Sequence, residues 1–313
     1  MLVNSDPLSL EKPEVIIHSD TLFSAIVNAY IYLFGEVDEA FFTAPSFILS
    51  SAFPFFGNTL FVKRPRVRML GDEAVSFAKK LKKVQFVSWD IFEKLAQGDK
   101  SFRFEEEDIK GEFLSSSKFE GGTFAMSEIP RNRIDPLTNE TEIFYSYRIE
   151  FPVDAGLFFF AEFRSDEEKP RFESALQLLG DMGIGGERSL GLGRFQVVES
   201  KKHEINVPDA TTKGNFTNLS LYHPTKSEVL GGILEEARYE FITRQNWIFS
   251  SGPVPLRSKK VKMFIEGSVF NNIPDAKGDV VDTTPEVAES TDYLSHRIYR
   301  SGLLFKYPIV LKE

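Results

Sequence analysis

Residues 183–195 read G-I-G-G-E-R-S-L-G-L-G-R-F, with five glycines and two arginines in thirteen positions. Glycine has no Cβ, so it reaches positive φ without steric cost and lets another chain come close to the backbone. Successive N–H groups in such a loop form concavities that bind anions, and the guanidinium groups of Arg188 and Arg194 suit phosphate. This stretch, the glycine loop, therefore predicts a site that holds a phosphate-bearing chain.

Two common nucleotide-binding motifs do not fit the glycine loop. A G-x-G-x-x-G motif that starts at Gly183 needs a glycine where Arg188 stands, and a Walker loop needs a lysine where Leu192 stands. Both motifs also run strand, loop, helix, whereas here a predicted helix over residues 170–179 precedes the loop and a predicted strand over residues 192–198 follows it. The alternative interpretation is a flexible connection that binds nothing.

The composition is that of a globular protein. At 313 residues and 42% hydrophobic content, the chain is long enough for about two domains with a substantial core. It has no cysteine, which excludes disulfides and thiolate sites and fits the reducing cytoplasm, where we expect it. We find no secretory signal and no apolar run long enough to span a bilayer, so we expect no membrane contact.

The charge is negative overall but unevenly distributed. A net charge of −9 argues against indiscriminate nucleic-acid binding, which depends on excess Lys and Arg. A local basic groove remains compatible with it, although a plain solvated surface explains each cluster singly as well. Basic residues cluster in residues 63–68, 79–83, 131–133 and 257–262.

The spacing of apolar residues predicts the elements. A first helix is expected over residues 21–34, with Ser19 and Asp20 as its cap. From residue 118 the pattern changes to period two, which predicts hairpin arms joined by a tip at residues 130–139 that carries Arg131 and Arg133. Long basic hairpins usually project and contact a partner. Further helices are expected over residues 72–82, 89–97 and 227–237, strands over 84–87, 157–163, 239–249, 260–270 and 303–311, and irregular segments over 201–214 and 274–290.

Helix, strand, strand, helix, strand is the order of a ferredoxin-like unit without its opening strand. We therefore predict an α+β fold with two ferredoxin-like (RRM-like) domains. The first spans residues 1–205 and includes inserted helices, the projecting hairpin at residues 119–151 and the glycine loop. The second, more degenerate domain spans residues 206–313.

Together these residues resemble the RAMP superfamily of CRISPR-associated proteins, whose hallmark is a glycine loop of the form G-hydrophobic-G, five residues, then G. Gly183, Ile184, Gly185 and Gly191 fit this form without a gap. Within the superfamily, the chain is most similar to subunit four of the type III-A (Csm) interference complex. The landmarks that occur in that family's order are residues 18–25, 51–55, 81–86, 133–138, 183–195, 267–270 and 304–308.

The resemblance implies a non-catalytic RNA-binding subunit. Such subunits hold the 5′ handle of CRISPR RNA (crRNA), dock the large polymerase-like subunit beside a backbone RAMP subunit, and meet target RNA indirectly. Their hairpin thumb displaces a nucleotide where guide meets target, and residues 131–139 stand at that position. The expected RNA contacts are His18, Ser19, Asp20, Lys63, Arg131, Arg133, Gly183, Gly185, Gly186, Arg188, Ser189, Gly191, Gly193 and Arg194.

One departure from the family lies at the N-terminus. Family members begin with a β-strand ahead of the polar segment that residues 1–13 form here. We therefore expect the first strand to be missing and a helix to be the first ordered element. Either the start codon is misplaced, or the sheet lacks an edge strand.

The alternative function is a metal-independent endoribonuclease that processes crRNA precursors, because related members use a general base such as histidine. His18 precedes a helix N-terminus, so it is a candidate base, an RNA contact or a structural residue of the cap region. Asp20 is better explained as a helix cap and Asp135 as a turn residue. No ligand spacing for a metal is present, and we expect no metal, no cofactor and no catalytic residue. A small-molecule binder is a weaker third hypothesis.

Overall fold

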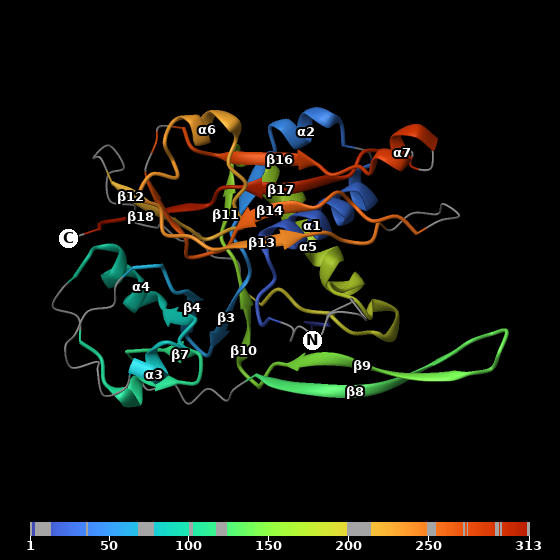
Figure 1. Ribbon diagram of the computed structural model, residues 1–313, viewed down its shortest axis with the longest axis horizontal. Coiled ribbons are helices and arrows are strands. Elements are labelled where there is room, and N and C mark those ends of the chain that lie inside the picture. Colours follow the sequence, from blue (N-terminus) through green and yellow to red (C-terminus); the bar gives the residue numbers. More distant parts are fainter. Residues whose placement is uncertain are drawn as a thin grey trace.

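The computed structural model describes residues 2–3, 14–35, 37–67, 78–99, 103–116, 124–198, 214–248, 255–271, 273, 275–291, 294 and 296–311. Helices are mixed with several small sheets, and a long hairpin extends from the body (Figure 1). The helices are α1 (Ser19–Phe34), α2 (Glu39–Thr43), α3 (Ala78–Leu81), α4 (Trp89–Ala96), α5 (Glu168–Met182), α6 (Lys226–Leu230) and α7 (Glu286–Thr291), with 3-10 turns η2 (Glu106–Asp108) and η3 (Arg188–Leu190). The strands are β1 (Leu2–Val3), β2 (Phe47–Leu49), β3 (Phe53–Phe56), β4 (Thr59–Lys63), β5 (Phe86–Ser88), β6 (Ile109–Lys110), β7 (Phe113–Leu114), β8 (Ala125–Ile134), β9 (Thr141–Glu150), β10 (Ala155–Phe158), β11 (Ala161–Phe163), β12 (Asn215–Asn218), β13 (Phe241–Arg244), β14 (Val261–Phe264), β15 (Val269–Asn271), β16 (Gly278–Asp282), β17 (Tyr299–Leu303) and β18 (Lys306–Ile309).

Helices α1 and α5 pack together in one hydrophobic cluster with β2. The predicted stripe of α1 is buried at Leu22, Ile26 and Ala29, and the helix ends at Gly35, where φ is +89°. Its N-cap is His18, which makes no capping bond through its side chain. The prediction that Ser19 and Asp20 cap this helix is therefore wrong, because both already lie in its first turn.

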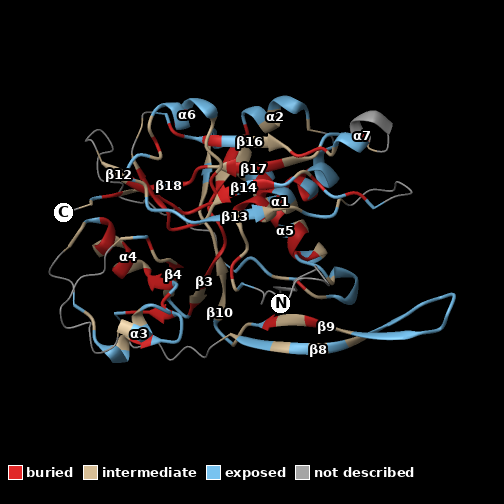
Figure 2. Ribbon diagram, in the orientation of Figure 1, coloured by how far each residue is buried: buried red, intermediate tan, exposed pale blue. Residues whose placement is uncertain are grey.

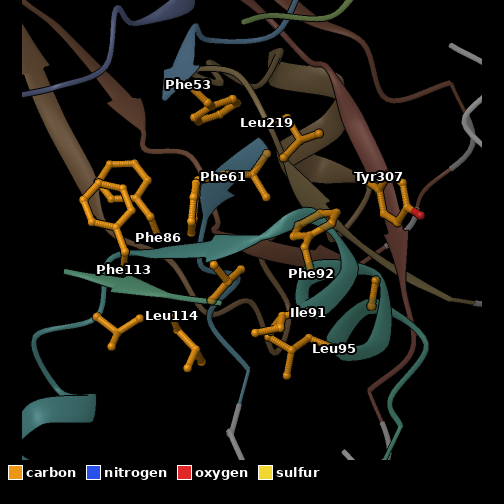
Figure 3. Packing of buried hydrophobic residues seen from close by; sticks show 14 of the residues in the cluster. Phe53, Phe61, Phe86, Ile91, Phe92, Leu95, Phe113, Leu114, Leu219 and Tyr307 are labelled. Atoms are coloured by element: carbon orange, nitrogen blue, oxygen red, sulfur yellow. The ribbon is translucent and has the colours of Figure 1, made fainter. Parts of the chain in front are cut away.

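A second cluster, rich in phenylalanine, lies under the sheet β10-β3-β4-β5-β7-β6 (Figure 3). The rings of Phe86 and Phe113 stack with centroids 5.2 Å apart, and α4 adds Phe92, whose ring packs against Tyr307 with centroids 4.9 Å apart. Leu219 and Tyr307 enter the same cluster from the C-terminal half. Each fully buried ring contributes roughly 1.5–3 kcal/mol. The two halves of the chain therefore share a core.

The strands of the long hairpin extend further toward its tip than predicted. β8 and β9 pair over ten residues each, and most of their side chains are exposed (Figure 2). Arg131 and Arg133 lie on β8, so their placement in the tip was wrong. Asp135 is the turn residue, as predicted, and accepts from the N–H groups of Leu137 and Thr138 at 2.8 and 2.9 Å.

Three other expectations fail for identifiable reasons. The first element is β1, which pairs with the edge of β9, and not a helix. Residues 157–163 split between two sheets, because the N–H of Phe160 donates to the Ser50 hydroxyl at 2.8 Å. No strand forms at residues 192–198, because the N–H of Phe195 donates to the carbonyl of Gly180 in α5.

The C-terminal half contains more structure than expected. β16 and α7 lie in the segment predicted to be a loop, residues 274–290. The helix predicted over residues 227–237 stops at Leu230, because Gly231 and Gly232 follow it. Predictions for residues 72–77, 119–123 and 201–213 lie outside the described residues. Within the described ranges, no helix combines the length and apolar character that crossing a membrane requires.

Candidate nucleic-acid interface

The base of the glycine loop is closed by contacts between its two arms. α5 ends at Gly183, whose N–H donates to the carbonyl of Leu179 at 2.7 Å, and the N–H of Ile184 donates to the carbonyl of Gly193 at 3.0 Å. A Cβ on Gly193 would lie 2.0 Å from the Ile184 carbonyl oxygen, and φ is +77° there. Gly183 and Gly193 are buried and permit the close approach of the arms, a use that the sequence did not reveal.

The tip of the loop is open to solvent. Gly185, Gly186 and Gly191 are exposed, and a Cβ on Gly191 would meet no atom within 4 Å. Across the described part of the chain, the N–H groups of residues 185–189 have no acceptor within the protein. A run of N–H groups in a bend is the arrangement that binds anions. The tip therefore has the backbone geometry that the sequence predicted.

The two arginines of the loop are both exposed. η3 carries Arg188 and Ser189, and Arg194 follows the second arm. Among the described residues, neither guanidinium group has a hydrogen-bond or ion-pair partner. An exposed arginine without a carboxylate partner keeps its five donors available to phosphate.

A third arginine reaches the loop from the long hairpin. Nη2 of Arg131 lies 2.8 Å from Oε2 of Glu187, and both side chains are about three-quarters buried, at 28% and 23% exposed. The Nε of Arg131 is buried without a hydrogen-bond partner. This ion pair joins the hairpin to the glycine loop across 56 residues of chain. Glu187 thus occupies part of the fork that was predicted to contact RNA.

Arg133 shares a hairpin face with Arg131, because successive side chains of a strand alternate. It lies opposite Glu142 in the ladder, as Arg131 lies opposite Phe144, and it is exposed. The face that carries both arginines is therefore the one turned to the glycine loop.

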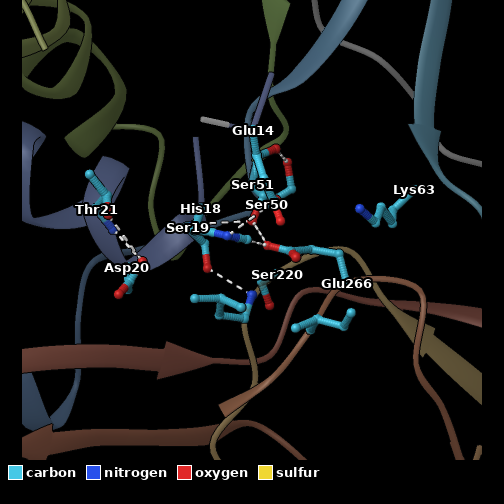
Figure 4. A network of polar contacts seen from close by, with 12 residues as sticks. Glu14, His18, Ser19, Asp20, Thr21, Ser50, Ser51, Lys63, Ser220 and Glu266 are labelled. Atoms are coloured by element: carbon cyan, nitrogen blue, oxygen red, sulfur yellow. Dashed lines mark hydrogen bonds and ion pairs between the residues drawn. The ribbon is translucent and has the colours of Figure 1, made fainter. Parts of the chain in front are cut away.

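His18 and Ser19 lie in a junction between the two halves of the chain (Figure 4). Nδ1 of His18 is 2.9 Å from Oε1 of Glu266, and only 11% of the His18 side chain is exposed. The Ser51 hydroxyl donates to the same carboxylate. The hydroxyl of Ser19 accepts from the N–H of Leu221 at 2.9 Å. Both residues therefore have intramolecular partners.

Asp20 completes the junction with two arginines. Its carboxylate accepts from Nε and Nη2 of Arg244 at 3.0 and 3.1 Å and also pairs with Arg300. The Asp20 side chain is fully buried. Burial by itself raises the pKa of the Asp20 carboxyl, but the two guanidinium groups outweigh it and hold the pKa well below its usual range.

The His18–Glu266 pair shifts both partners toward their charged forms. Burial alone lowers the pKa of His18, but the Glu266 carboxylate outweighs this effect, and the pKa is raised above 6.5. For Glu266, burial raises the pKa, whereas the charge and hydrogen bond of His18 lower it below its ordinary value. Each partner therefore favours the charged form of the other, and the two charges compensate each other.

Lys63 lies beside the junction and not at the glycine loop (Figure 4). Its Nζ donates to Oε1 of Gln85 at 2.8 Å and lies 5.0 Å from the ring centroid of Phe86. Its Cγ is 3.6 Å from the position that a Cβ on Gly267 would take.

The structure thus divides the predicted residues into two groups. One comprises the glycine loop with Arg131 and Arg133, and the other comprises the junction residues His18, Ser19 and Asp20, with Lys63 beside them. RNA contact by the junction residues stays a prediction. Sequence reasoning missed Glu187, Arg244, Glu266 and Arg300. Only Glu187 carried a signal, as the one acid in a basic loop. Among the described residues no cluster of three metal-ligating side chains occurs.

Known proteins resemble this chain along nearly its whole length. A family model described as the RAMP superfamily matches residues 7–196, and one described as the CRISPR Csm4 C-terminal domain matches residues 211–309. A curated relative from Thermococcus onnurineus, CRISPR system Cms protein Csm4, is 27% identical over 310 residues, which cover 94% of this chain and 92% of that protein.

Two solved structures have a similar fold. A chain in the crystal structure of the Csm3-Csm4 subcomplex of the type III-A CRISPR-Cas interference complex matches with a TM-score of 0.64 at 20% identity, and 98% of each chain is covered. A chain in the crystal structure of the Csm1-Csm4 cassette in complex with cA4 matches with a TM-score of 0.60 at 21% identity, and 96% of each is covered.

Proposed function

The chain belongs to the RAMP superfamily and carries a Csm4 C-terminal domain, and on this premise we propose that it is the non-catalytic subunit of a type III-A CRISPR-Cas effector complex that holds the 5′ handle of crRNA. In this role it docks a large polymerase-like subunit and a backbone RAMP subunit, and it meets target RNA indirectly. The assemblies in which the similar solved chains occur, Csm3-Csm4 and Csm1-Csm4, support these partners.

The observation that carries the proposal is the exposed tip of the glycine loop. Among the described residues, the N–H groups of residues 185–189 have no acceptor, and the guanidinium groups of Arg188 and Arg194 in the same loop have no partner, in a chain whose net charge is −9. Backbone N–H groups and guanidinium forks recognise phosphate oxygens independently of base sequence. A single strand held in this way needs no catalytic group.

The long hairpin fits the role of the thumb at the end of the handle. The ion pair between Arg131 and Glu187 holds the hairpin against the glycine loop, and Arg133 is exposed on the same face of the hairpin. The packing of α1 and α5 over β2 supports a ferredoxin-like unit in residues 1–205, and we assign a second such unit to residues 206–313.

A salt titration of handle-RNA binding tests the proposal. Purified protein is titrated with a labelled single-stranded RNA of the repeat-derived handle, and fluorescence anisotropy is followed at several salt concentrations. We expect Arg188→Ala and Arg194→Ala each to weaken binding and to flatten the slope of log K against log salt by about 0.7. Arg164→Ala, an equal change of charge at an exposed site elsewhere, is the control. Affinities equal to the parent across the titration would refute the proposal.

The geometry of His18 favours the non-catalytic role over the endoribonuclease. A general base needs a ring nitrogen that can reach the substrate proton, whereas Nδ1 of His18 faces Glu266, Nε2 lies 3.6 Å from Oε2 of Glu14, and only 11% of the side chain is exposed. Repeat RNA incubated with the protein in EDTA should therefore remain intact. A discrete cut that His18→Ala abolishes would reverse this assignment.

A further inference from the structure

The ribbon formed by β13 and β14 has one face turned to solvent. Side chains alternate along it, with Ile242 and Met263 directed inward and Phe241, Thr243 and Lys262 exposed. Pairing continues past the strands through the bridge between Trp247 and Arg257. The ribbon lies in the C-terminal half, apart in sequence from the glycine loop and the long hairpin (Figure 1).

This ribbon is one-sided in charge. Residues 241–264 contain five basic residues and no Asp or Glu, in a chain that has nine more acidic than basic residues overall. Arg244 is the one of the five that points inward, to Asp20. The others, Arg257, Lys259, Lys260 and Lys262, belong to the basic cluster that the glycine loop does not use, and Arg257, Lys260 and Lys262 are exposed.

Two large aromatic rings lie among these cations. Phe241 is 51% exposed and Trp247 is 53% exposed, although rings of this size are usually mostly buried. Nζ of Lys262 lies 5.0 Å from the centroid of Phe241, and the Arg257 guanidinium lies 4.3 Å from the centroid of Trp247. Each exposed ring is thus paired with one cation across the ribbon.

We propose that the outer face of this ribbon, defined by Phe241, Trp247, Arg257 and Lys262, binds single-stranded RNA. Bases stack on the free faces of the two rings, and the neighbouring cations contact the backbone phosphates, which is the usual combination in single-strand binding. Six residues of extended chain separate the rings by roughly 20 Å, a span suited to several nucleotides. The excess of positive charge favours a polyanion over the large protein partner.

The site goes beyond the handle contact of the glycine loop and rests on separate residues. Its RNA is either the guide or the target, because both present the same stacking bases and phosphates. The experiment therefore first tests for single-strand binding and then identifies the strand.

Tryptophan fluorescence of the full-length protein provides a direct measure. The chain has two tryptophans, and Trp89 is partly buried against Phe92 and Tyr307 whereas Trp247 is 53% exposed, so we expect stacking on Trp247 to dominate any quenching. We expect quenching by an unrelated single-stranded 12-mer RNA and little by the same sequence as a blunt duplex. Trp247→Phe should remove the signal, and Lys262→Ser should weaken binding about three- to tenfold. Lys226→Ser, at another exposed lysine, should not.

The Arg188→Ala, Arg194→Ala double variant separates this site from the proposed function. Quenching that persists in this variant supports an independent ribbon site, even if the handle assay fails for the parent. In the assembled complex, 4-thiouridine placed in the guide or in the target identifies the strand that crosslinks to the ribbon. Absence of quenching, equal quenching by duplex, or ribbon variants that bind RNA normally but lose the large subunit would each overturn the proposal.

Discussion

The junction and the glycine loop both contain arginine side chains, which have different roles in the two regions. In the junction, Asp20 is buried between Arg244 and Arg300, so each charge is compensated within the protein. In the glycine loop, Arg188 and Arg194 are exposed and, among the described residues, have no partner. A compensated buried charge holds the fold together, whereas an exposed unpaired charge contributes little to folding and stays available to a ligand. Burial, and not residue type, separates the two roles.

The largest effect on this comparison is expected from Asp20→Asn. The substitution leaves two guanidinium groups buried without their counter-charge, which typically costs about 3–5 kcal/mol. Urea unfolding should show this loss, while the RNA affinity of the folded protein stays close to the parent value. Asp166→Asn, an equal change at an exposed position, serves as the control. If the Asp20→Asn protein were as stable as the parent but bound RNA more weakly, Asp20 would belong to the RNA-binding surface, and the junction would not differ in role from the glycine loop.

The next largest effect is the difference in stability loss between alanine substitutions at two glycines of the loop. Ala at position 193 puts a Cβ into the Ile184 carbonyl at a positive φ, so we expect Gly193→Ala to lose roughly 2–4 kcal/mol through steric overlap and strain. Gly191→Ala has open space around it and should lose only about 1–2 kcal/mol from its left-handed backbone. Thermal unfolding of both variants measures the difference. Equal losses would show that the arms do not meet as described.

A smaller effect is expected from Glu187→Gln. Loss of the carboxylate charge weakens the contact that holds the Arg131 fork, so handle RNA should bind several-fold more tightly, while stability falls by roughly 1–3 kcal/mol because the pair is largely buried. The matched control is Glu142→Gln, which removes an equal charge from the hairpin without breaking this ion pair. If both variants gain affinity equally, general charge is the cause and release of Arg131 is not.

The smallest effect is the pH dependence of the junction. The pKa of His18 is raised in the folded protein, so its ion pair with Glu266 contributes stability below pH 6.5 that is lost as pH rises through the folded value. The pKa values of Asp20 and Glu266 are lowered in the folded protein. Their ionised carboxylates therefore stabilise the fold at pH values above their ordinary pKa values, and this stabilisation is lost as pH falls through the folded pKa values. In urea titrations, His18→Gln should flatten only the alkaline side. An unchanged alkaline slope would argue against a charged His18.

Local patterns predicted the elements whose causes are local. The periodicity of α1, α4 and α5, the period-two arms of the long hairpin and the turn at Asp135 follow from neighbouring residues. The ends of the hairpin strands could not be predicted in this way, because Arg131 is equally compatible with a tip and with a strand. β1 was missed because its partner, the edge of β9, lies far along the chain.

The candidate site divides in the same way. The sequence located the glycine loop, because glycine spacing acts through the backbone of the residues that carry it. It could not show that Gly193 allows the two arms of the loop to approach each other, or that Glu187 forms an ion pair with Arg131. Both contacts depend on a second segment of the chain.

The amino-acid sequence by itself determined the RAMP-type glycine loop, the exposed basic hairpin and the mixture of helices and strands, because these depend on residues near one another in the chain. Only the tertiary structure decided that Asp20 faces Arg244 and Arg300, which lie 224 and 280 residues away. It alone decided as well that Lys262 lies over the ring of Phe241 and Arg257 over the ring of Trp247. A charge acquires its role from what surrounds it, and folding determines those surroundings.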